Sequence, residues 1–173
     1  MNPPADSTII PGTSSEPFLL SRFNEYAEHV ATMALQCRRN ITILSQDFDQ
    51  QILNNDAVEN AIRSFLTNNS RVARVRILVQ NPEKSIHQGH RLMELSRKLS
   101  SFIEIRQPAN QHKGIAEAAI TFDRSGFLYR ELGDRPEGSG CYQDPLRTLE
   151  LERKFDEIWA PSEPLLEFRR LSI

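Results

Sequence analysis

Cysteine is scarce in this sequence of 173 residues, which contains only Cys37 and Cys141. The two are far apart and match no metal-ligand spacing, so they predict reduced thiols in a cytoplasmic protein rather than a metal site. No apolar run approaches the roughly 20 residues that span a bilayer, so we expect no transmembrane helix. The N-terminus is polar and rich in proline, and it lacks the basic and apolar segments of a signal peptide.

A strong charge of either sign is also missing. The chain has 21 basic and 23 acidic residues and a net charge of −2. Nothing therefore attracts the whole molecule to nucleic acid or to an anionic membrane, and such a contact requires a local patch. We also find no Ser-His-Asp order, no phosphate-binding glycine loop and no dinucleotide fingerprint. We expect no cofactor and no membrane partner.

The sequence does contain an alternation of helices and strands. Residues 1–17 hold four prolines and predict a flexible arm, and residues 18–173 predict a single domain. The periodicity of apolar residues gives the order α-β-α-β-α-β, which favours a sheet that is parallel at least in part. His29 falls on the polar side of the first helix and is expected to face solvent. The expected helices are residues 21–39, about 55–68 and 86–99, and the expected strands are 41–44, 72–79 and 102–105.

The second half of the chain predicts a hairpin and a closing helix. Residues 116–131 read as two short strands joined by a tight turn, in which Gly126 is free to adopt a positive φ. Residues 133–144 are rich in glycine and charge and predict a mobile loop. A final helix is expected from Pro145 to about Trp159. The tail, Leu165–Leu171, is expected either to add an edge strand or to lie along the body.

This layout resembles one half of a phospholipase D-like domain. The resemblance rests on the segments ITILSQDFDQQIL, VRILVQ and FIEIR, on the hairpin AITFDRSGFLYRE and on the helix end FDEIW. It covers roughly Phe23 to Trp159 and implies an α/β fold with a mixed sheet flanked by helices. Two halves meet across an internal or dimer axis in this family, so the resemblance also implies a homodimer.

Catalytic members of that family carry a His-x-Lys-x4-Asp motif on a strand, followed by Gly-Ser, and the histidine attacks phosphorus. If Asp123 is the motif aspartate, the histidine and lysine positions are Ala116 and Ala118, and Gly-Ser is replaced by Arg130-Glu131. Alanine can neither attack phosphorus nor donate a proton, so we expect no catalysis by this route. Asp123 is then interpreted as a turn residue that caps the hairpin.

Aligning His112 as the motif histidine fails too, because Gly114 then stands for the lysine and Ala119 for the aspartate. A ligand site is still expected at the carboxyl ends of the strands, where open α/β sheets form their binding crevice. Helix N-terminal amides could help to hold a phosphate there. The side chains expected to bind it are Lys84, His87, His90, Arg91, His112 and Lys113.

His87 and His90 are three residues apart and could form half a metal site. With no cysteine nearby, we interpret them instead as a polar first turn and expect no metal. A second group of residues is basic: Arg63, Arg71, Arg74 and Arg76. Arg74 and Arg76 share one strand face, which could meet the phosphate backbone of nucleic acid if it is exposed. Alternatively, these arginines protect an edge strand from aggregation and pair with acidic residues.

Three hypotheses follow for function. The first is a non-catalytic phospholipase D-like module that binds a phosphate-bearing ligand, nucleic acid foremost, or a regulatory protein partner. The second is an active phosphodiesterase or nuclease that uses His87, His90 or His112 in an unfamiliar arrangement. The third is a protein-interaction subunit that uses the N-terminal arm and the final helix.

Overall fold

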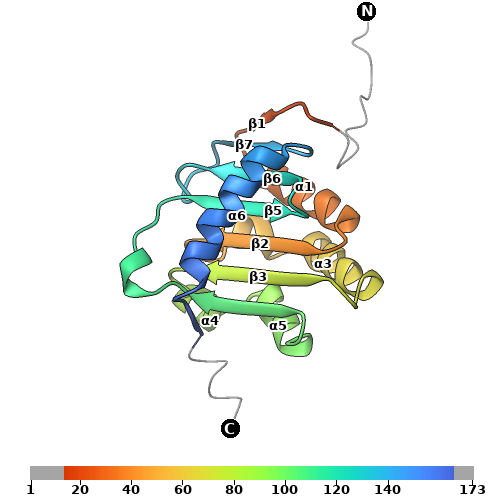
Figure 1. Cartoon of the computed structure of the whole chain (residues 1–173). Coiled ribbons are helices and arrows are strands. Elements are labelled where there is room, and N and C mark those ends of the chain that lie inside the picture. The colour runs from red at the N-terminus through yellow and green to blue at the C-terminus, as the bar shows by residue number, and fades with distance from the viewer. Residues whose placement is uncertain (1–13, 166–173) are drawn as a thin grey trace, which may run out of the picture.

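We describe residues 14–165 from a computed structural model of the protein. The described residues form one sheet with helices on both faces (Figure 1). Its strands are β1 (Phe18–Leu20), β2 (Asn40–Ser45), β3 (Arg74–Val79), β4 (Ile103–Gln107), β5 (Ala118–Phe122), β6 (Gly126–Arg130), β7 (Gly138–Cys141) and β8 (Glu163–Pro164). The helices are α1 (Phe23–Gln36), α2 (Gln50–Leu53), α3 (Asp56–Asn68), α4 (Glu83–Gln88), α5 (Arg91–Lys98), α6 (Pro145–Trp159) and the short 3-10 helix η1 (Asn110–His112).

The sheet is mixed, as the resemblance implied. Its strand order is β1-β7-β6-β5-β2-β3-β4-β8. Three neighbouring strands, β2, β3 and β4, run parallel. On one side of them β5, β6, β7 and β1 are antiparallel, and on the other side β8 is antiparallel to β4. The carboxyl ends of β2, β3 and β4 therefore meet at one edge of the sheet, and their amino ends meet at the opposite edge.

Alternating side chains explain why helices cover both faces. Ile43 and Ile77 point into the large core beneath α1, α3 and α5, whereas Leu44 and Leu78 point to the other face and pack against Phe155 of α6. Figure 1 shows α6 crossing the front of the sheet, with α1, α3 and α5 behind it. Burial of each such side chain contributes about 1.5–3 kcal/mol.

Two of the expected helices are confirmed, and each begins at a side-chain cap. α3 begins after Asn55, whose side-chain oxygen accepts the Val58 N–H at 3.0 Å. α6 begins after Asp144, which accepts the Arg147 N–H at 3.1 Å, and Pro145 occupies the first turn. A cap of this kind satisfies an amide that has no partner within the helix and stabilises the helix by about 1 kcal/mol.

The single helix expected over residues 86–99 is wrong. The segment contains two short helices, α4 and α5, which are separated at Gly89 and His90. Gly89 has a φ of 81°, which ends α4 in a conformation that residues with a side chain rarely adopt. The His90 side chain then caps α5. The helical spacing of apolar residues therefore continues across a point where the helix itself is interrupted.

The hairpin of β5 and β6 is confirmed, but its turn differs from the expectation. The positive φ values belong to Asp123 (53°) and Arg124 (59°), and the Ser125 N–H donates to the Phe122 carbonyl at 3.0 Å. These are the features of a type I′ turn, whose twist matches that of the flanking strands. Gly126 instead starts β6 at a crowded position, where a Cβ would lie 2.6 Å from Cε of Met33.

The loop expected to be mobile over residues 133–144 contains β7, which pairs with β6 and β1. His29 is also not solvated as expected. Its Nδ1 lies 2.6 Å from the Tyr142 hydroxyl, and its ring stacks on Phe18 at 4.4 Å between centroids. Helical periodicity cannot reveal these contacts, because they come from Phe18 in β1 and from Tyr142, the residue after β7.

Some expectations concern residues outside the described range. These are most of the flexible arm over residues 1–17 and the tail after Leu165. Within the described range, β8 pairs with β4 through Pro164 and Glu163. None of the helices described here has the length and the apolar character needed to cross a lipid bilayer.

Candidate functional site

The carboxyl ends of β2, β3 and β4 do form a hollow, at the place where a ligand crevice was expected. It has a volume of about 340 Å³. Gln46, Gln80, Gln107 and Lys113 line it, and so does Ala116, the position that the resemblance assigns to the catalytic histidine.

Side-chain amides at this edge hold the segment that leads into β5. The Gln80 Nε2 group donates to the Ile115 carbonyl at 2.5 Å, and the Gly114 N–H donates to Gln80 Oε1 at 2.9 Å. Gln46 Nε2 donates to the Ala116 carbonyl at 3.2 Å. These amide groups are therefore already engaged with the protein backbone, and Lys113 is the one cation among the residues that line the hollow.

Ala118, the position assigned to the catalytic lysine, is buried and lies opposite Arg130 in the β5–β6 register. Arg130 Nη2 lies 2.6 Å from Asp49 Oδ1, and both side chains are almost completely buried. The Arg130 guanidinium also lies over the rings of Phe23 and Tyr26. The space beside Ala118, which Arg130 also lines, is about 10 Å³, so no cavity large enough for a phosphate opens there.

Asp123 caps backbone amides. Its carboxylate accepts the N–H groups of Arg38 and Arg39 at 2.7 Å each and that of Asn40 at 2.9 Å. These amides belong to the junction between α1 and β2. Asp123 therefore holds the segment between α1 and β2 in addition to its place in the hairpin turn. The sequence had suggested only the role in the turn.

His90 is held inside the protein. Its Nε2 donates to the Phe48 carbonyl at 2.9 Å, and its Nδ1 accepts the Leu92 N–H at 3.1 Å. Both ring nitrogens are thus engaged in the neutral tautomer. Burial lowers the pKa of His90 to about 4, and the Phe48 carbonyl and Asp47 act in the opposite direction.

The remaining residues of the expected ligand set are dispersed. Arg91 pairs with Asp56 and Glu59 on α3, at 2.5 and 3.2 Å. Lys84 lines a separate hollow of about 240 Å³ next to Asp49. His87 is exposed on α4, and His112 is half-buried on η1. Of the six residues, the structure places only Lys113 in the hollow beside Ala116.

The expected basic set is also divided. Arg63 pairs with Glu59 on α3 at 3.0 Å. Arg76 pairs with Asp156 at 2.8 Å and lies over the rings of Phe155 and Trp159, beside α6. The edge-strand interpretation is wrong, because β3 lies between β2 and β4.

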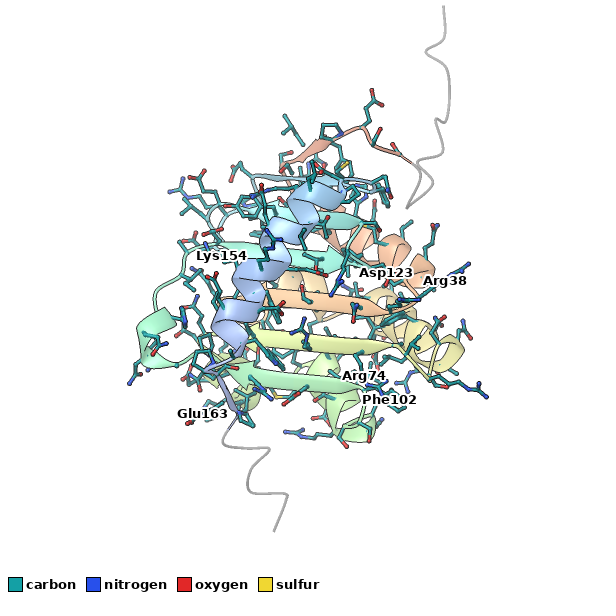
Figure 2. The ribbon with its side chains drawn as sticks, viewed as in Figure 1. Arg38, Arg74, Phe102, Asp123, Lys154 and Glu163 are labelled. Carbon is teal, nitrogen blue, oxygen red and sulfur yellow. The ribbon has the colours of Figure 1, made fainter. Side chains whose placement is uncertain are left out.

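Four exposed arginines converge at the amino ends of β2 and β3. They are Arg38, Arg39, Arg71 and Arg74, and we call this surface the basic end. The Arg74 N–H donates to the Arg39 carbonyl at 2.9 Å, and Asn40 lies opposite Arg74 in the strand register. Figure 2 shows Arg38, Asp123, Arg74 and Phe102 at this end of the sheet.

The four arginines of the basic end carry more charge than the Asp123 carboxylate beside them. Within residues 14–165, none of these four arginines takes part in an ion pair. Asp123, the carboxylate beside them, accepts the backbone amides described above. The arginines also follow the carboxyl-terminal ends of α1 and α3, where the helix dipoles favour positive charge.

Arg38 and Arg39 were not among the residues expected to bind nucleic acid. A signal for them was present, because Arg38 and Arg39 come just before the first expected strand, and Arg71 and Arg74 lie at the start of the second. Neighbouring parallel strands begin at the same edge of a sheet, so residues before both strands come together in space. That inference required the β2–β3 pairing to be known.

Comparison with solved structures identifies the fold. The fold is that of the phospholipase D-like proteins. Nuc from Salmonella typhimurium, a phospholipase D family member, superposes with a TM-score of 0.60 at 13% identity, over 86% of this chain and 98% of that chain. A phosphatidylserine synthase from Haemophilus influenzae gives a TM-score of 0.54 at 16% identity, over 87% of this chain and 39% of that one. At these identities, the likeness establishes the fold alone.

TrmBL2, an archaeal chromatin protein whose structure shows a novel mode of DNA binding, has a TM-score of 0.63 at 11% identity. The alignment covers 93% of this chain but only 57% of TrmBL2. No curated protein matches the sequence. Residues 22–171 match the family described as Domain of unknown function (DUF7931), and the chain belongs to that family.

Proposed function

We propose that this protein is a non-catalytic phospholipase D-like module that binds nucleic acid through the basic end. The observation that carries the proposal is a group of four exposed arginines at one end of the sheet, which form no ion pair within residues 14–165. The whole chain has a net charge of −2, so this local excess of positive charge is unlike the rest of the molecule. Phosphate backbones are the common cellular polyanions that such a group attracts.

The lack of catalysis is argued from the carboxyl edge of the sheet. Ala116 and Ala118 offer no nucleophile and no phosphate-binding amine, and Arg130 is held by Asp49. His90, one of three histidines that could replace the nucleophile, has both ring nitrogens engaged. We therefore expect no turnover of bis-p-nitrophenyl phosphate above that of a His87→Ala/His112→Ala variant. Turnover that disappears in this variant would contradict the non-catalytic proposal.

The known structures support the binding part of the proposal. TrmBL2 is described as a DNA-binding chromatin protein, and it shares the fold over most of this chain. Its DNA binding is a property of TrmBL2, of which this chain covers little more than half. The likeness is to a DNA-binding protein that contains this fold, and the exposed arginines indicate which surface we expect to contact DNA here.

The proposal is tested by fluorescence anisotropy with labelled DNA. The patch variant is Arg38→Gln/Arg71→Gln. A matched control is Arg135→Gln/Arg153→Gln, which removes the same charge from exposed arginines that form no ion pair in the described part of the chain. We expect about a tenfold or greater loss of affinity in the patch variant and a much smaller loss in the control. Equal losses would show that only net charge matters and would overturn the proposed site.

A further inference from the structure

We infer that the basic end binds double-stranded rather than single-stranded nucleic acid. This inference rests on the proposed function and adds the kind of nucleic acid that the surface fits. It follows from three features of the described residues. The arginine group is compact, the half-buried aromatic rings are covered by other side chains, and the neighbouring hollow is small.

The arginines form a compact group of positive charge. They lie at the starts of two adjacent strands, whose backbones are about 5 Å apart in a sheet. A duplex carries about one negative charge per 1.7 Å of its axis, and a single strand about one per 3.4 Å. A group of this size therefore meets more phosphates on a duplex, and it releases more counterions when it binds.

Single strands are usually held by bases that stack on exposed aromatic rings. Within residues 14–165, none of the large exposed apolar side chains is aromatic. The half-buried rings are each already covered by a side chain of this protein. These pairs are Phe18 with His29, Phe23 with Arg130, Phe102 with Arg74, Tyr129 with Arg147, and Trp159 with Arg106.

Phe102 is the most informative of these rings, because it lies at the basic end itself (Figure 2). Arg74 lies over it, with the guanidinium carbon 5.2 Å from the ring centroid. A base could stack on this face of Phe102 only after Arg74 had moved away. That movement would displace Arg74, one of the four charges that attract the nucleic-acid backbone, from its position at the basic end.

An unstacked base also finds no pocket beside Arg38. The hollow lined by Gln36, Cys37 and Asp123 has a volume of about 50 Å³. This is far below the roughly 150 Å³ of a protein cavity that admits benzene, so the hollow is too small for a nucleobase. The basic end therefore offers charge to a backbone but neither a platform nor a pocket to a base.

The test compares one DNA duplex of about 20 base pairs with each of its unpaired strands, chosen without self-complementarity, at the same salt concentration. We expect the wild-type protein to bind the duplex at least about tenfold more tightly than either strand. The patch variant should lose most of this preference, and the control variant should keep it. Circular dichroism and a thermal melt establish that both variants are folded.

The outcomes separate this inference from the proposed function. Equal affinity for duplex and strands, or tighter binding of a strand, would overturn the inference and leave the nucleic-acid proposal standing. If none of the three probes binds, both the inference and the nucleic-acid proposal are overturned. A duplex preference that survives in the patch variant would place the binding surface elsewhere and would overturn the assignment to the basic end. A parallel RNA duplex shows whether the preference extends to A-form helices.

Discussion

Asp123, the residue that the resemblance aligns with the motif aspartate, has a structural role. Its carboxylate accepts three consecutive amides at the α1–β2 junction, and its φ of 53° lies in the left-handed region. Hydrogen bonds to a charged acceptor are stronger than those between neutral groups. Short polar side chains such as those of aspartate and asparagine also tolerate a positive φ better than alanine does. Asp123 therefore stabilises the segment that presents Arg38 and Arg39.

We predict that Asp123→Ala lowers the free energy of unfolding by about 2 kcal/mol, and that Asp123→Asn lowers it by less. Asparagine keeps one acceptor oxygen and the turn conformation, whereas alanine keeps neither. Urea denaturation of the two variants measures both losses. Equal stability of wild type and Asp123→Ala would show that the carboxylate does not hold this junction.

His90 predicts a dependence of stability on pH. Its pKa is about 4 in the folded protein, because the ring is buried, and about 6.5 in the unfolded chain. Between these values the unfolded chain binds more protons than the folded protein does. The contribution of His90 is therefore complete above pH 6.5 and is lost as the pH falls toward 4.

We expect this residue alone to remove about 2 kcal/mol of stability between about pH 7 and pH 5. The comparison is with His90→Asn, in which the side chain still caps α5 but does not titrate in this range. Chemical denaturation at the two pH values should show a smaller loss in the variant. A loss as large in His90→Asn as in wild type would mean that other groups govern the acid response.

At the scale of elements, β7 depends on the absence of a side chain at Gly138. A Cβ there would lie 2.2 Å from the Tyr129 carbonyl oxygen and 2.3 Å from the Tyr26 hydroxyl. The backbone oxygen cannot move without disturbing the β6–β7 pairing. β1 pairs with β7 and is joined to α1 by a link of two residues. The positions of both β1 and β7 therefore depend on Gly138.

We predict that Gly138→Ala lowers the free energy of unfolding by about 3 kcal/mol or more. Gly114→Ala serves as its control, because Gly114 has a φ of 86° with no atom within 4 Å of the added Cβ. That variant should cost only the backbone strain, about 1 kcal/mol. A melt in which Gly138→Ala is the more stable of the two would contradict this account of β7.

The sequence was sufficient for the elements whose signals are local. Pro145 marked the first turn of α6, and alternating apolar residues marked β3. It was insufficient where a contact joins distant segments. The break at Gly89 was hidden because the leucine spacing continues into α5, and β7 was hidden because its glycines satisfy a packing need rather than a propensity.

The candidate site was likewise only partly predictable from the sequence. The hollow at the carboxyl edge was predictable, since parallel strands end together, and Lys113 was correctly placed beside it. The engagement of His90 and Arg91 was not predictable, because their partners Phe48, Asp56 and Glu59 are far away in the sequence. The basic end was half found, because Arg71 and Arg74 were recognised without the pairing that brings Arg38 and Arg39 beside them.

At the scale of the whole molecule, the two ends of the parallel strands differ in character. The carboxyl end holds amides tied to the backbone and an internal ion pair, and the amino end presents unneutralised arginines. The homodimer implied by the phospholipase D resemblance stays a prediction, which sedimentation at tens of micromolar protein would test. A dimer would double the number of basic ends and strengthen binding to a long duplex by avidity.

The most direct test of the central claim is the salt dependence of duplex binding, measured for wild type, the patch variant and the control variant between about 50 mM and 200 mM salt. Each arginine that contacts a phosphate contributes about 0.9 to the slope of log affinity against log salt. The account predicts that the patch variant has a slope shallower by about 2 than wild type, whereas the control slope is unchanged. A patch variant with the wild-type slope would show that the arginines of the basic end do not contact the phosphate backbone.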